Sequence, residues 1–155
     1  MTREELESVL ASDLQALSAA SDQLSRVFAT RHSLSANDFQ ALLRILVAEG
    51  GGEPLTVGQL GRSLGISSAA TTYLVDRLIK SRHIRRQPHP TDHRSTVLRY
   101  DDHGMEVARE FFGPLGALTH SALATISDED LATAHKVITV LIDVVRSYES
   151  SLPQR

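Results

Sequence analysis

The chain has 155 residues, of which 23% are charged, and its formal net charge is -3 at pH 7. This length suits one domain with a buried core and helical extensions. The absence of cysteine excludes disulfides, thiolate metal sites and cysteine-based redox sensing. No apolar run approaches the ~20 residues of a membrane span, and the N-terminus lacks a signal-peptide apolar region, so we expect a cytoplasmic protein without a membrane partner.

The first predicted element is one long helix over residues 3–32, with acidic residues in its first turn. Its apolar residues recur near heptad spacing: Leu6, Leu10, Leu14, Leu17, Leu24 and Phe28. A helix of this length carries more apolar surface than a small domain can cover. We therefore expect an arm that pairs with a second copy of the chain; a helix packed on its own domain is the alternative.

The second predicted helix begins at Ser35, with Asp38 at its N3 position, and ends at the glycines of residues 50–52. Its broad apolar face predicts that this helix belongs to the core: Phe39, Leu42, Leu43, Leu46 and Val47. The three glycines lack the lysine and the strand-loop-helix context of a phosphate-binding loop, so we expect a turn there.

Residues 55–80 predict a short strand and then a helix-turn-helix. Thr56 and Gln59 have capping-box spacing, Gly65 ends the first of the two helices, and Ser67 is a good N-cap for the second. An apolar stripe is expected along the second helix at Ala70, Leu74 and Leu78, with Val75 and Ile79 beside it. The opposite face is expected to carry Ser68, Thr71, Thr72, Arg77 and Lys80.

Small polar residues at the start of this second helix suit the base edges of a DNA major groove. Residues expected to meet base edges are Ser68, Ala69, Thr71 and Thr72, whereas Ser67 is favoured as the helix cap. Arg77 and Lys80 lie further along and are expected to contact phosphate. Because Arg, Asn and Gln are missing from the front of the helix, we expect modest direct readout, with DNA shape and wing contacts supplying much of the specificity.

Two strands, at residues 84–87 and 96–100, are expected to form a hairpin that completes a winged helix. The segment between them contains two prolines and is predicted to be a loop. Its tip offers His93 and Arg94, and Asp92 is close enough in sequence to orient the arginine side chain. Arg is the residue that narrow minor grooves attract, so Arg94 is expected to enter one.

Basic residues are concentrated in this part of the chain. Residues 54–104 hold eight Lys or Arg against four acidic residues, a net +4, whereas the remainder carries -7. Basic charge gathered on one module is expected of a surface that contacts DNA phosphates. A solvated basic face without a partner is the alternative.

Residues from Asp101 to about Ile126 are predicted to be helical, with a kink or break near Phe112 because Gly113-Pro114 follows. A last helix is expected to start at Ser127 and to be apolar over more than half of its circumference, so it must be buried on two sides. The expected dimer interface combines residues of the first and last helices: Leu6, Leu10, Leu14, Leu141, Val145 and Tyr148.

The run from Ile66 to Gly104, with Asp92-His93-Arg94 at its wing, resembles the winged-helix segment of MarR-type transcriptional regulators. The resemblance is specific over residues 55–104, and the flanks agree only in having helices of the expected lengths. Three positions depart from the usual pattern: the family usually has Gly at Arg82, often a second Arg at His93, and usually Leu-Thr at Tyr100-Asp101.

The resemblance implies a mainly α fold with a small β-hairpin wing. A winged helix-turn-helix domain (35–104) would lie between an N-terminal dimerisation helix (1–34) and C-terminal helices that complete the dimerisation region (105–155). It also implies a homodimeric repressor on double-stranded DNA, with a near-palindromic operator read by two recognition helices ~34 Å apart. Regulators of this family commonly release DNA when a small-molecule effector binds, here in a site lined by the first, second and fifth helices.

A catalytic function is not expected. No Ser lies in a G-x-S-x-G elbow, and no helix carries a His-x-x-x-His or His-Glu-x-x-His pair, so we predict neither enzymatic activity nor a cofactor. A metal site formed by His103 or His120 with nearby acidic residues stays open as an alternative. The rival function is a winged-helix module that binds protein and makes no use of DNA.

Overall fold

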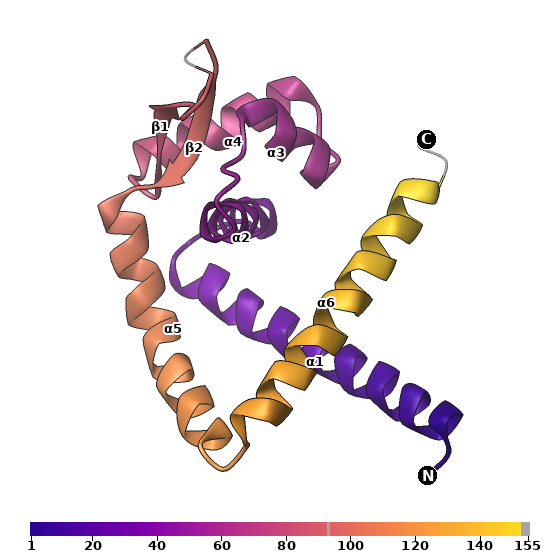
Figure 1. The fold of residues 1–155 in the computed structure, drawn as a ribbon. Coiled ribbons are helices and arrows are strands. Elements are labelled where there is room, and N and C mark those ends of the chain that lie inside the picture. The colour runs from indigo at the N-terminus through magenta and orange to yellow at the C-terminus, as the bar shows by residue number, and fades with distance from the viewer. Residues whose placement is uncertain (93, 153–155) are drawn as a thin grey trace. The chain divides into compact units, whose positions relative to one another are not determined.

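The structure, a computed structural model, describes residues 1–92 and 94–152. Its elements follow in the order α1 (Arg3–Arg31), α2 (Ala36–Gly50), α3 (Val57–Leu64), α4 (Ser68–Lys80), β1 (Ile84–Pro88), β2 (Thr96–Tyr100), α5 (Asp102–Leu123) and α6 (Asp128–Ser151) (Figure 1). The predicted class, mainly helical with a small hairpin, is confirmed. Within the described ranges, none of the helices is long and apolar enough to cross a membrane.

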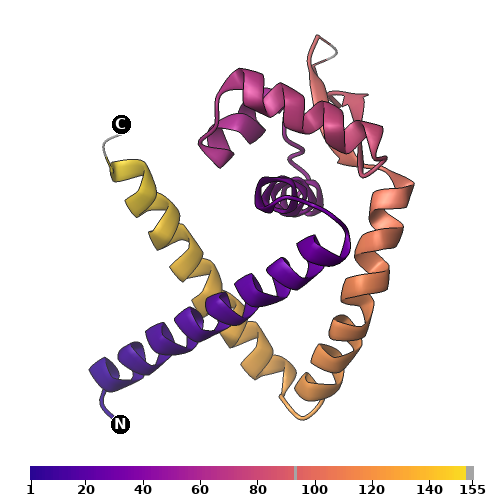
Figure 2. The same ribbon diagram turned by 180° about the vertical axis from the view of Figure 1, so that it is seen from behind.

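The chain divides into two compact units, Met1–Phe111 and Phe112–Arg155, with the boundary inside α5. In the first unit, α2 lies between α1 and the α3–α4 pair in both views, and the hairpin rises beside α4 (Figures 1 and 2). The second unit holds the rest of α5 and α6. The predicted division at residues 34 and 104 separates a DNA-binding domain from dimerisation helices. This division by function stays a prediction.

Helix starts follow the predicted capping residues closely. Ser35 and Thr56 each accept a hydrogen bond from the N3 backbone N–H, and the N3 side chains Asp38 and Gln59 accept from the cap N–H in return. Ser67 caps α4 through the N–H of Ala70, and Ser127 caps α6 through that of Asp130. Each such cap stabilises its helix by about 1 kcal/mol.

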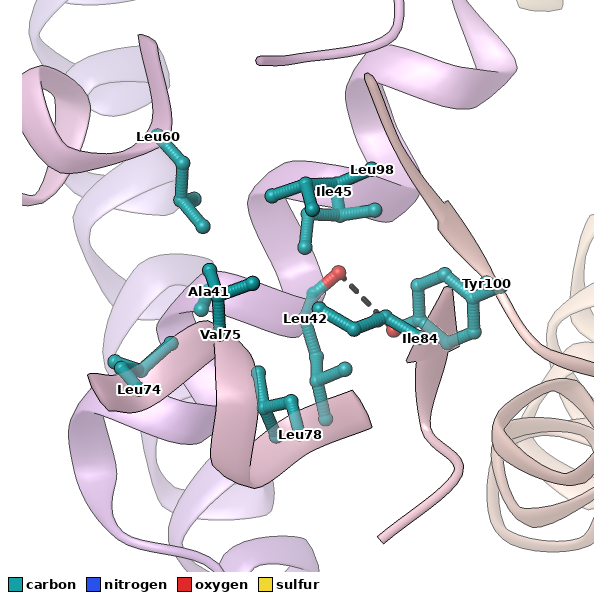
Figure 3. Close-up of a cluster of buried hydrophobic side chains, with 10 residues drawn as sticks. All are labelled: Ala41, Leu42, Ile45, Leu60, Leu74, Val75, Leu78, Ile84, Leu98 and Tyr100. Atoms are coloured by element: carbon teal, nitrogen blue, oxygen red, sulfur yellow. Dashed lines mark hydrogen bonds between the residues drawn. The ribbon is translucent and has the colours of Figure 1, made fainter. Parts of the chain in front are cut away.

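The core of the first unit is a cluster of side chains from α2, α3, α4 and the hairpin (Figure 3). It consists of Ala41, Leu42, Ile45, Leu60, Leu74, Val75, Leu78, Ile84, Leu98 and Tyr100. Tyr100 places a polar group in this cluster, and its hydroxyl donates to the carbonyl oxygen of Leu42 at 3.0 Å. Burial raises the pKa of Tyr100, with a smaller contribution from Glu49, so the hydroxyl stays protonated and donates.

The hairpin is antiparallel, with Ile84 opposite Tyr100 and Pro88 opposite Thr96. Its first strand therefore extends one residue beyond the predicted end at residue 87, which proline permits at the end of an edge strand. The predicted short strand at Leu55 is wrong, because the residues before α3 form no regular strand. The Leu55 carbonyl nevertheless accepts a hydrogen bond of 2.8 Å from the N–H of Leu98.

Helix α5 runs through Pro114 without interruption. Of the two alternatives expected near Phe112, the break is therefore wrong, and the kink stays a prediction. Proline has no N–H to donate to the carbonyl four residues earlier, but the helix continues on both sides of Pro114. The boundary between the two units, between Phe111 and Phe112, falls just before this proline.

Candidate nucleic-acid interface

The position of the predicted recognition helix α4 is set by its close approach to α3. Gly61 of α3 faces Thr71 of α4, and a Cβ on Gly61 would lie 2.5 Å from the Thr71 Oγ1. Gly65 then ends α3 in the left-handed conformation, with φ of 66°. Glycine adopts this conformation without the steric penalty of a side chain. The two glycines allow the tight turn and close crossing of the helix-turn-helix.

Thr71 was predicted from the sequence to face DNA, and this prediction is wrong because the residue is buried. It is only 1% exposed, and its hydroxyl donates to the Ser67 carbonyl at 2.8 Å. The predicted apolar stripe ran through Ala70 instead, yet Ala70 is exposed. The buried side of α4 thus starts one residue later than expected, because the approach of α3 at Gly61 covers Thr71. Thr71 cannot meet a base edge from this position.

The other residues at the front of α4 lie at the surface. Ser68, Ala69 and Thr72 are exposed, and their predicted base contacts stay predictions. Thr72 donates its hydroxyl to the Ser68 carbonyl at 3.0 Å, which leaves its methyl group and the hydroxyl lone pairs for other contacts. Ser67 acts as the helix cap, which is the role that the sequence analysis favoured.

Arg77 does not have the free side chain that a phosphate contact needs. Its guanidinium donates to the buried carboxylate of Asp38 on α2, and it lies 3.4 Å from the Ser35 hydroxyl oxygen. Burial alone would raise the pKa of Asp38, but hydrogen bonds from Arg77 and Ser35 outweigh burial and lower it. The carboxylate is therefore charged at neutral pH and neutralises Arg77. Lys80, the second predicted phosphate contact, is exposed.

Tyr73, which was not predicted from the sequence as a DNA contact, is 69% exposed on α4. Helical spacing places it with Ala69, Asp76 and Lys80 on the side opposite Leu74 and the other buried residues. This spacing could have identified the residue, but only after the buried side had been correctly assigned. The guanidinium carbon of Arg77 lies 5.4 Å from the Tyr73 ring centroid, within cation–π range.

The wing is held by hydrogen bonds within its own turn. The Asp92 carboxylate accepts from the backbone N–H of Arg94 at 3.1 Å, and the Asp92 carbonyl accepts from that of Ser95 at 3.0 Å. Asp92 was predicted to orient the Arg94 guanidinium, but its carboxylate contacts the Arg94 backbone N–H instead. Arg94 is exposed. His93, predicted beside it as a DNA contact, lies outside the described residues.

Arg82, the residue just after α4, has φ of 59°, a left-handed conformation that side chains disfavour. Its N–H donates to the Ile79 carbonyl at 2.9 Å, and its own carbonyl accepts from Gly104 at 3.2 Å. A Cβ on Gly104 would overlap the backbone of His83. The end of α4, the start of β1 and the start of α5 are therefore joined through a backbone contact that depends on this turn.

His83, the next residue, is buried and lies close to His103, with ring centroids 5.7 Å apart. Burial lowers the pKa of His83, and His103 and His32 lower it further, so the ring is neutral at pH 7. Within the described residues, no three His, Cys, Asp or Glu side chains gather so that they could hold a metal ion. The metal-site alternative at His103 or His120 gains no support.

A cleft of about 430 Å³ lies beside the Asp38–Arg77 pair. Its lining comes from the end of α1, the α1–α2 loop, α2, the end of α4 and the residues that follow: His32, Ser33, Leu34, Ser35, Asp38, Arg77, Leu78, Ser81 and His83. The effector site was expected between the first, second and fifth helices; in this cleft α4 takes the place of the fifth. Arg77 thus lines the cleft and also lies within cation–π range of the exposed Tyr73.

Comparison with known proteins gives matches over this region and over the whole fold. Residues 32–95 match the model of the MarR family. The HTH-type transcriptional regulator YcgE of Bacillus subtilis, itself uncharacterized, is 28% identical over 101 residues, which cover 65% of this chain and 66% of that protein.

Among solved structures, a MarR family protein from Bacillus stearothermophilus is similar with a TM-score of 0.62 and 23% identity, over 94% of this chain and 99% of that one. A mutant of S. aureus MepR bound to an oligodeoxyribonucleotide is similar with a TM-score of 0.53 and 12% identity, over 88% and 97% of the two chains. At these identities the structural matches establish the fold. Taken together, the family model over residues 32–95, the curated relative and the structural matches support a winged helix-turn-helix regulator of the MarR type.

Proposed function

We propose that this protein is a homodimeric regulator that binds double-stranded DNA in a sequence-specific manner and represses transcription. The observation that carries the proposal is the exposed front of α4, with Ser68, Ala69 and Thr72, on the same module as a wing that presents Arg94. These two features suit a major groove and the adjacent minor groove. The oligodeoxyribonucleotide bound to the similar MepR mutant supports the same use of the fold.

The charge distribution supports contact with DNA phosphates. The +4 of residues 54–104 belongs to the module that contains α4 and the wing, although the whole chain is acidic. Lys80, Arg85 and Arg94 are exposed on this module, whereas Arg77 and Arg86 are paired with Asp38 and Asp76. The exposed cations are therefore the candidates for phosphate and minor-groove contacts.

The homodimer is supported by apolar side chains that a single chain leaves in solvent. On α1, Leu6 is 50% exposed and Leu10 is also exposed, and on α6 Val145 and Tyr148 are each 66% exposed. Leu14 and Leu141 are half-buried. Pairing these helices with those of a second copy would bury the apolar faces, at about 25 cal/mol per Å² of apolar surface removed from water.

Release from DNA by a small molecule is supported by the cleft at the Asp38–Arg77 pair, whose volume lies in the range of small-ligand sites. A ligand there would touch Arg77, which belongs to α4 itself. An effector that competes for Arg77 would therefore disturb the recognition helix directly.

Selection from a pool of random-sequence duplexes, with the bound fraction sequenced, tests the proposal. A dimer should enrich a near-palindromic site whose half-sites are about 10 base pairs apart, since two recognition helices then enter successive major grooves. Transcription in vitro from a promoter overlapping that site should fall when the protein is added. Failure to bind any duplex at low salt would overturn the proposal and favour the protein-binding module. Raised transcription would overturn the repressor assignment alone.

A further inference from the structure

Tyr73 is the largest exposed side chain on the outward side of α4. This side also carries Ala69, Asp76 and Lys80. The charge of Asp76 is balanced by Arg86 of β1, whose guanidinium lies 3.0 Å from the Asp76 carboxylate. The surface around the tyrosine therefore lacks an unbalanced negative charge that would repel a DNA backbone.

The tyrosine is held in place by a series of contacts that starts in the core of the domain. Ser35 and Asp38 form the capping box of α2, Asp38 binds Arg77, and the Arg77 guanidinium carbon lies 5.4 Å from the Tyr73 ring centroid. Asp38 is buried and fixed by hydrogen bonds from the backbone and hydroxyl of Ser35. The guanidinium thus has its charge satisfied by Asp38 and lies within cation–π range of the Tyr73 ring.

An exposed aromatic ring held in this way loses little conformational freedom on binding. Apolar side chains distinguish thymine in the major groove through its C5-methyl group. Ala69 and the Thr72 methyl group are also exposed at the front of α4, but they are small, and the tyrosine ring offers the largest apolar surface on this face to such a methyl group.

We propose that Tyr73 is a specificity-determining residue that contacts a thymine methyl group in the major groove, and that Arg77 and Asp38 are its positioning residues. This inference rests on the proposed DNA-binding function. It assigns Arg77 a role different from the phosphate contact that its position in the sequence suggested.

The experiment measures binding of the wild-type protein and of Tyr73→Ala to the selected duplex, with each thymine in turn replaced by uracil. Uracil lacks only the methyl group. At one symmetric pair of positions, the replacement should lower the affinity of the wild-type protein several-fold. Tyr73→Ala should bind the thymine site roughly tenfold more weakly than the wild-type protein does. Its affinity should not fall further when uracil replaces thymine. Tyr73→Phe keeps the ring and should keep the sensitivity to uracil. Because Tyr73 is exposed, these variants do not threaten folding.

Arg77→Gln separates positioning from phosphate contact. A lost phosphate contact would lower the slope of log affinity against log salt by about 0.9. A positioning residue should leave the slope unchanged while the thymine preference falls. The double variant Asp38→Asn with Arg77→Gln avoids an unpaired buried carboxylate and should behave like Arg77→Gln alone.

The outcomes distinguish this inference from the proposed function. If the wild-type protein binds its selected site but Tyr73→Ala keeps the same affinity and the same response to uracil, Tyr73 does not read thymine and only this inference fails. A lower salt slope for Arg77→Gln would return Arg77 to the phosphate contacts and overturn its positioning role. If the wild-type protein binds no DNA, both the inference and the proposed function fail.

Discussion

At the scale of single residues, the turn after α4 contains a strained backbone conformation at Arg82. The sequence indicated this position because the residue there is not glycine. Arg82 occupies a position where the family usually has glycine, and its φ of 59° requires the left-handed conformation. Within the described ranges, Ser33 is the other non-glycine residue with positive φ. A non-glycine residue in this conformation costs roughly 1–2 kcal/mol.

Arg82→Gly should therefore stabilise the protein. The relief of strain exceeds the roughly 0.5–1 kcal/mol that glycine loses through the greater entropy of the unfolded chain, so we expect a net gain of up to about 1 kcal/mol. The midpoint of urea unfolding measures it. Arg85→Gly, at an exposed strand position without positive φ, is the matched control and should destabilise. A lower midpoint for Arg82→Gly would mean that the arginine side chain contributes more than its backbone strain costs.

Other residue-level features could not be read from the sequence. The Asp38–Arg77 pair joins residues 39 positions apart, and no local pattern indicates which cation a buried carboxylate will meet. Thr71 and Ala70 are both small residues at adjacent positions, so periodicity alone could not decide which one the crossing of α3 would bury. The glycine at position 61 was the available signal, since a helix-interior glycine indicates close packing.

At the scale of elements, the sequence predicted most of the helix starts because capping is local. The side chains of Ser35, Thr56, Ser67 and Ser127 each bond to a backbone group three residues away. The break expected near Phe112 was wrong because a single proline within a long helix removes one hydrogen bond without forcing the chain out of the helix. The hairpin was predicted from its two short strands and the proline-containing loop between them.

The wing gives a prediction at this scale. Arg94→Ala should weaken binding to the selected duplex on the order of tenfold, about 1.4 kcal/mol, because the exposed guanidinium at the wing is lost from the minor groove. Fluorescence anisotropy measures the affinity. Arg3→Ala removes the same charge from the exposed start of α1 and should leave the affinity nearly unchanged. Equal losses in the two variants would indicate a general charge effect and remove the wing from the mechanism.

At the scale of the whole molecule, a single chain leaves many apolar side chains exposed to solvent, above all on α6. None of the described residues of α6 is buried, although Val140, Val144, Val145 and Tyr148 are among its exposed apolar residues. The sequence predicted this surplus from the composition of the last helix. The sequence also predicted which residues of the first and last helices pair with a second copy, and that pairing stays a prediction.

Replacing Leu141 and Val145 with Glu should split the dimer. The two carboxylates would lie in a surface that the dimer removes from water, where a charge without a partner is strongly unfavourable. Sedimentation velocity should give a monomer for this variant and a dimer for the wild-type protein. Ala132→Glu with Thr139→Glu adds the same charge on the opposite side of α6 by helical spacing and should leave the dimer intact. A dimer that persists in the Leu141 and Val145 variant would contradict the proposed interface.

Binding of DNA by the basic winged-helix module is tested by the salt dependence of wild-type binding to the selected duplex. With six or more phosphate contacts, the affinity should fall by ~10³-fold or more between 50 and 200 mM salt. Variants that keep both the dimer interface and the phosphate contacts should share this slope, whereas loss of Arg94 should reduce the affinity at every salt concentration. An affinity that is the same at both salt concentrations would contradict the claim, because association through apolar helices alone does not respond to salt in this way.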